Sequence, residues 1–112
     1  MPEPEFAPIG PLSDLKFDPG AMVLVGGREI ALFPVDGDVA NGLHALDNAC
    51  PHAGGPLATG DLTDGKIECL WHGWRFDLED GSCPFASTPV QVHEARVVDG
   101  QVEVRLAAPK SL

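Results

Sequence analysis

The chain has 112 residues, a net charge of -10 and 44% hydrophobic residues. A chain of this length forms one domain with a modest core, and so large an acidic excess argues against a nucleic-acid-binding surface. Charge alone fits two interpretations equally, steering toward basic partners and an acidic surface that only maintains solubility. No stretch approaches the ~18 apolar residues of a membrane span, and the N-terminus does not read as a secretion signal, so we expect a soluble, cytoplasmic protein.

Turn-forming residues shape the composition. The 13 glycines and 11 prolines make up about a fifth of the chain, against roughly 12% in average proteins. This excess favours short strands joined by turns, and no segment carries a convincing helical pattern. We therefore predict an all-β fold of short antiparallel strands.

The chain divides into three parts. Residues 1–10 contain several prolines and are expected to form an extended leader. Residues 11–106 form the predicted domain, and residues 107–112 a C-terminal tail. Within the domain, Gly26-Gly27 and Asp99-Gly100 are typical of hairpin turns. The predicted strands cover residues 22–25, 28–35, 43–47, 66–70, 75–78, 90–98 and 101–106.

Two short segments each combine one cysteine with one histidine: Cys50-Pro51-His52 and Cys69-Leu70-Trp71-His72. Thiolate sulfur suits iron-sulfur clusters and zinc, and imidazole suits iron and zinc. A structural zinc site with two cysteines and two histidines usually groups the cysteines together and the histidines together. A two-iron cluster can instead take the two cysteines on one iron and the two histidines on the other. The spacing favours the cluster, with a zinc site and four unrelated residues as alternatives.

The segments 50–57 (CPHAGGPL) and 69–77 (CLWHGWRFD) resemble the two ligand loops of Rieske-type [2Fe-2S] proteins, in particular the small Rieske ferredoxins. The resemblance covers roughly residues 10–106 and implies a Rieske-type fold, with a cluster-binding subdomain at about 48–89 formed by two hairpin-tip loops. It implies one [2Fe-2S] cluster, whose inner iron is bound by Cys50 and Cys69 and whose outer iron is bound by His52 and His72. Residues 84–89 match the proline-containing third loop that covers the cluster in this family.

The loops differ from those of the high-potential branch of the family. That branch has an extra cysteine in each loop and a serine and a tyrosine hydroxyl after the second histidine. This chain has residues such as Gly55 and Trp71 at the cysteine places, and no tyrosine. Hydrogen bonds to cluster sulfurs raise the potential, so we predict a value near the low end of the Rieske span of roughly -150 to +300 mV. If each ligand imidazole carries a titratable proton, the potential also falls with pH.

The resemblance implies a one-electron carrier between a flavoprotein, NAD(P)H-dependent reductase and a terminal oxygenase. We expect a monomer without catalytic residues, which meets basic surfaces on both partners. It is not the oxygenase, because that subunit needs a further mononuclear iron site with two histidines and a carboxylate. The two remaining histidines, His44 and His93, are expected to be surface or satisfied histidines and not metal ligands. The alternatives are a small subunit of a multisubunit reductase, such as NADH-dependent nitrite reductase, and a zinc-stabilised binding module. Residues 39–42 and Cys83 receive no functional role.

Overall fold

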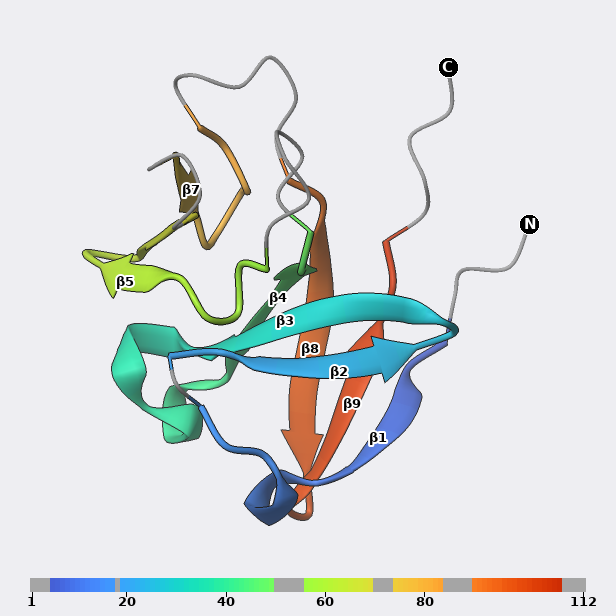
Figure 1. Ribbon diagram of the computed structural model, residues 1–112. Helices are drawn as coiled ribbons and strands as arrows, with labels where there is room; N and C mark the ends of the chain where they lie inside the picture. The colour runs from blue at the N-terminus through green and yellow to red at the C-terminus, as the bar shows by residue number, and fades with distance from the viewer. Residues whose placement is uncertain (1–4, 18, 50–55, 70–73, 84–89, 108–112) are drawn as a thin grey trace.

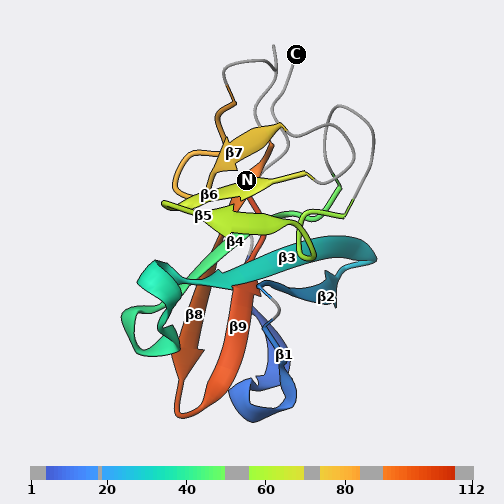
Figure 2. The ribbon, with the colours of Figure 1, turned by 60° about the vertical axis from the view of Figure 1, so that its left-hand side comes forward.

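The computed structural model describes residues 5–17, 19–49, 56–69, 74–83 and 90–107. These residues form two antiparallel sheets and three short 3-10 helices. The larger sheet has the order β1-β9-β8-β4-β3-β2, and the smaller sheet has the order β5-β6-β7. The smaller sheet lies to the upper left of β3 and β4 in Figure 1 and above them in Figure 2. The described part contains no α-helix, and the predicted all-β fold class is confirmed.

The elements have the following bounds. The larger sheet contains β1 (Ala7–Pro11), β2 (Ala21–Val25), β3 (Arg28–Pro34), β4 (Leu43–Asp47), β8 (Val92–Val98) and β9 (Gln101–Arg105). The smaller sheet contains β5 (Asp61–Thr63), β6 (Lys66–Glu68) and β7 (Arg75–Asp77). The 3-10 helices are η1 (Leu12–Asp14), η2 (Val35–Gly37) and η3 (Val39–Asn41). Among these elements there is no helix with the length and hydrophobicity needed to cross a bilayer.

The six-stranded sheet curls around its own apolar core. Its edge strands β1 and β2 approach each other although they do not pair. Successive side chains of a strand point to opposite faces, so alternate residues of β2, β3, β4 and β9 turn inward. The inward residues are buried together and are Val23, Val25, Ile30, Leu32, Leu43, Ala45, Val102 and Val104.

Strand β3 separates this core from a second one. Ala31 and Phe33 point away from the first core and pack with Ile67 and Phe76 of the smaller sheet. The residues of β3 from Ile30 to Pro34 are therefore all buried, because both faces of the strand are covered. A strand covered on both faces reads as a continuous apolar run, as this one does.

Hairpin turns were predicted correctly at two places and missed at a third. Gly26-Gly27 joins β2 to β3, and Asp99-Gly100 joins β8 to β9, with positive φ at all four residues. Asp64-Gly65 makes an equivalent turn between β5 and β6. The type I′ turn, common in two-residue hairpins, needs positive φ at both central positions, which explains these residue types.

The beginning of the sheet lies earlier in the chain than expected. Ala7 pairs with Val104, so part of the predicted leader 1–10 is the edge strand β1. The Phe6 ring lies beneath the guanidinium of Arg96, 3.8 Å from the ring centroid. The backbone there is extended, as predicted, but it belongs to the six-stranded sheet.

Candidate metal centre

The first predicted ligand loop is closed at its base by strand β4 and the residues that follow it. Cys50 and His52 lie in 50–55, outside the described residues, whereas Ala49 and Pro56 on either side form an isolated antiparallel bridge. The Leu57 amide donates to the Asn48 carbonyl at 2.7 Å. The two ends of the loop are therefore held side by side.

The second loop leaves from the β6–β7 hairpin. Glu68 pairs with Arg75 in the ladder, and their side chains form an exposed ion pair at 3.1 Å. The Cys69 amide donates to the Trp74 carbonyl at 2.7 Å. The residues flanking 70–73 thus form the base of a hairpin, as predicted, while His72 itself lies outside the described residues.

The base of a third loop is also closed. This loop, residues 84–89, is the predicted covering loop and lies outside the described residues. The Val90 amide donates to the Gly81 carbonyl at 3.0 Å. Gly81 has φ +74, and a Cβ on it would lie 2.1 Å from the Val90 carbonyl oxygen. Glycine is therefore required here both for the backbone angle and for the close contact.

The bases of the three loops meet in one buried cluster. Leu57 comes from the first, Cys69 from the second, and Cys83 and Val90 flank the third. The Cys69 side chain is fully buried, and both Cys69 and Cys83 are free thiols. A free cysteine where three loops close fits a soft-metal site, since thiolate is the ligand that iron-sulfur clusters use.

The ligand set as a whole stays a prediction. Of the four predicted ligands, the structure describes Cys69 but not Cys50, His52 or His72. Within the described ranges alone, no group of three or more histidine, cysteine, aspartate or glutamate side chains is arranged to hold a metal. The described part therefore supplies one thiol and the closed bases of the loops that carry the other three.

A partly buried polar network ties β4 to β8. His93 is buried, and its Nε2 lies 2.7 Å from Asp47 Oδ1, while its Nδ1 accepts the Ala107 amide at 2.8 Å. Since Nδ1 accepts a hydrogen bond, the proton of a neutral ring sits on Nε2 and is donated to Asp47. Asp47 Oδ1 also accepts a hydrogen bond from the Arg28 guanidinium at 2.8 Å. His93 is thus a satisfied core histidine, as expected.

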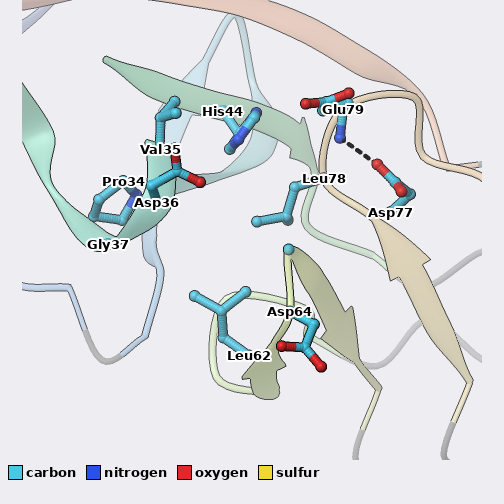
Figure 3. A pocket seen from close by; sticks show the side chains of 11 residues that line it. Pro34, Val35, Asp36, Gly37, His44, Leu62, Asp64, Asp77, Leu78 and Glu79 are labelled. Atoms are coloured by element: carbon cyan, nitrogen blue, oxygen red, sulfur yellow. Dashed lines mark hydrogen bonds between the residues drawn. The ribbon is translucent and has the colours of Figure 1, made fainter. Parts of the chain in front are cut away.

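An acidic groove opens on the side where the two sheets meet (Figure 3). Asp36 of η2 lies on one wall, and Asp64, Asp77 and Glu79 lie on the other, with the ring of His44 between the walls. The Glu79 amide donates to Asp77 at 2.8 Å, which fixes the turn after β7. Sequence reasoning missed this groove because Asp36 and Asp64 are far apart in the chain.

Two nearby segments acquire structural roles. Residues 39–42, which had no predicted role, form η3 with its cap, and Asp38 accepts the Ala40 amide at 2.9 Å. Hydrogen bonds from the Ser82 side chain and amide hold the pKa of exposed Asp80 below its ordinary value. The Asp38 hydrogen bond fixes the turn beside the groove, and the Ser82 hydrogen bonds fix the turn before the third loop.

In a comparison with known protein families, residues 5–101 match the Rieske [2Fe-2S] domain. The anthranilate 1,2-dioxygenase ferredoxin subunit of Burkholderia cepacia is 33% identical over 104 residues, which cover 91% of this chain and 93% of that subunit. The 4beta-methylsterol monooxygenase of Methylococcus capsulatus is 45% identical over 51 residues, which cover 46% of this chain and 13% of that enzyme.

Solved structures share the fold over nearly the whole chain. A protein described as an NADH-dependent nitrite reductase small subunit from Mycobacterium tuberculosis is 26% identical, with a TM-score of 0.79 and coverage of 96% of this chain and 100% of that one. A ferredoxin and oxygenase complex of carbazole 1,9a-dioxygenase contains a chain that is 25% identical, with a TM-score of 0.73 and coverage of 95% and 97%.

Proposed function

The chain belongs to the Rieske [2Fe-2S] domain family, and from this premise we propose that it carries single electrons from a flavoprotein, NAD(P)H-dependent reductase to a terminal Rieske oxygenase. The observation that carries the proposal is the likeness to a dioxygenase ferredoxin subunit over 91% of this chain and 93% of that subunit. The protein is the electron-transfer component of such a system and not its catalytic subunit.

A Rieske domain holds one [2Fe-2S] cluster, which supplies a one-electron redox centre. We assign Cys50, His52, Cys69 and His72 as its ligands. The described residues support this assignment in two ways: Cys69 is a free, buried thiol, and the loops that carry the other three ligands close around the same apolar cluster. The apolar cluster around Cys69 excludes water from this side chain, which lowers the local dielectric constant there.

Partner recognition through charge is part of the proposal. The chain carries 17 acidic and 7 basic residues, and the groove of Figure 3 is lined by four carboxylates and His44. Acidic surfaces attract basic partner surfaces and raise association rates at low ionic strength. We expect the second-order rate of electron transfer to either partner to fall as salt increases, and a rate that does not depend on salt would contradict electrostatic steering.

The decisive experiment is anaerobic preparation followed by iron and sulfide analysis, with an electron-resonance spectrum of the reduced protein. We expect equal amounts of iron and acid-labile sulfide and a reduction potential near the low end of the Rieske span. Protein prepared anaerobically that contains zinc and no iron would favour the zinc-stabilised module instead, once zinc substitution during expression is excluded.

A permanent small subunit of a multisubunit reductase is the second candidate. It is favoured by the likeness to the NADH-dependent nitrite reductase small subunit, with a TM-score of 0.79. A mobile carrier is expected to purify as a monomer from the cytoplasm and to bind its partners weakly. Isolation from native cells in a stable complex with a larger flavoprotein would favour the subunit instead.

A further inference from the structure

Asn48 occupies the base of the first ligand loop and is one of two polar residues that are buried in the described part of the chain. It follows β4 directly and precedes the loop that carries Cys50 and His52 by one residue. A buried amide needs partners for its donors and its acceptor, because each unpaired group costs free energy.

All four hydrogen-bonding groups of Asn48 are used. Its backbone amide donates to the Glu29 carbonyl at 3.0 Å, and its carbonyl accepts the Leu57 amide at 2.7 Å. Its side-chain Oδ1 accepts the buried Ala58 amide at 2.9 Å, and Nδ2 donates to Glu29 Oε1 at 3.2 Å. The residue therefore binds both the far end of the loop and strand β3.

We propose that Asn48 is a positioning residue of the cluster site, which fixes the base of the loop carrying Cys50 and His52 on strand β3. This inference rests on the proposed function. The side chain connects residue 48, before the loop, to Ala58 after it. Losing this acceptor leaves the Ala58 amide unpaired and weakens the base, which the Leu57–Asn48 backbone hydrogen bond and the Ala49–Pro56 bridge then hold alone. Because Leu57 and Ala58 belong to the same buried cluster as Cys69, weakening the first base also loosens its position relative to Cys69.

The test uses cluster-loaded protein and three variants with the formal net charge of the wild type. Asn48→Leu removes both side-chain hydrogen bonds. Glu29→Gln/Asn48→Asp restores both: the aspartate still accepts from the Ala58 amide, and only the bond between residues 29 and 48 has reversed polarity, with the Gln amide as the donor. Asn41→Leu is the matched control, because Asn41 also bridges backbone through its side chain, to the Val35 carbonyl at 3.2 Å, but in the exposed η3 turn.

Two rates are measured anaerobically for each protein: loss of cluster absorbance in the presence of a chelator, and global unfolding by circular dichroism. We expect Asn48→Leu to release its cluster about tenfold faster or more, the double variant to release it within about threefold of the wild type, and the control to match the wild type. We also expect the reduction potential of Asn48→Leu to change while that of the control does not. If Asn48→Leu does not fold, Asn48→Ser is measured in its place with the same expectations, because its shorter side chain does not reach Ala58.

Three results would overturn the role of Asn48: release from Asn48→Leu at the wild-type rate, no rescue by the double variant, or release that rises only in proportion to global unfolding with an unchanged potential. The last result is what a purely structural residue would give. Wild-type protein that holds no iron or sulfide would overturn the proposed cofactor as well, whereas a loaded wild type with an unaffected Asn48→Leu overturns this inference alone.

Discussion

The two sheets differ in how much of their stability they supply themselves. The six-stranded sheet has strands of five to seven residues and encloses its own core. The three-stranded sheet has strands of three residues each, and its buried side chains pack against β3 and against the loop bases. Strands of three residues are at the short end of the range in globular proteins, so they supply little pairing and little buried area of their own. The smaller sheet therefore depends on its surroundings, and the predicted ligand Cys69 follows directly after its central strand β6.

The largest expected effect is the loss of the cluster from Cys69→Ser, because a hydroxyl is a poor ligand for an iron-sulfur cluster. We expect complete loss of iron and sulfide. Amide hydrogen exchange should then show lost protection in β5, β6 and β7 while β3, β4, β8 and β9 remain protected, since local opening follows local stability.

Cys83→Ser is the matched control for Cys69→Ser. Cys83 is also a free, buried cysteine of the same apolar cluster, but it is not a predicted ligand. We expect this variant to keep its iron and sulfide. Equal loss of iron from both variants would contradict the distinction between the two cysteines, and loss of protection in both sheets after Cys69→Ser would contradict the independence of the larger sheet.

A smaller effect is expected from His93→Leu, which changes the larger sheet. The replacement leaves the Ala107 amide without its acceptor and removes a donor to Asp47. The Ala107 amide is only half-buried, so we expect a loss of about 1 kcal/mol, the low end of the range for an unpaired buried group, and the free energy of unfolding in urea measures it. His44→Leu is the control, because His44 lines the groove and is only partly buried, and we expect it to change stability by less than about 0.5 kcal/mol. Equal losses of unfolding free energy in His93→Leu and His44→Leu would contradict the stabilising role assigned to the hydrogen bonds of His93.

A matched pair of isoleucines tests the comparison between the sheets directly. Ile30 in the larger sheet and Ile67 in the smaller are both fully buried. Ile→Val at either position removes one methylene and should lower the free energy of unfolding by about 0.5–1.5 kcal/mol. If the smaller sheet opens separately, Ile67→Val alone should also increase hydrogen exchange within β5–β7 at low denaturant. Identical exchange patterns in the two variants would show that both sheets open together.

The sequence predicted those parts of the fold in which a local backbone demand selects the residue. Gly26-Gly27 and Asp99-Gly100 mark hairpins because few residues accept positive φ. The alternating pattern of 101–106 predicted β9 for the same kind of local reason. Asp64-Gly65 carries this signal too and could have been recognised, but β5 and β6 are too short to alternate clearly.

The rest depends on contacts between residues that are distant in the chain. Ala7–Pro11 contains two prolines and becomes a strand only because β9 pairs with it. The pairing of Asn48 with Ala58 and Glu29, and of His93 with Asp47, requires the assembled sheet. The motif predicted the ligand types at the site, whereas the residues that hold the loop bases carry no motif.

The smallest effect is expected at the turn after β7, where hydrogen bonds from Ser82 lower the pKa of Asp80 from its ordinary 3.8. A carboxyl group whose pKa is lower in the folded than in the unfolded state stabilises the fold above the unfolded pKa, and this contribution is lost as the pH falls through the folded pKa. Asp80→Asn removes the charge, so wild type should melt slightly above the variant at pH 7, and the difference should shrink as the pH falls below 3.8 and vanish below the folded pKa. The melting temperatures of both proteins across this range measure it. A difference that stays constant into strong acid would mean that the Asp80 charge does not contribute, and that the hydrogen bonds of the turn alone hold the end of the smaller sheet.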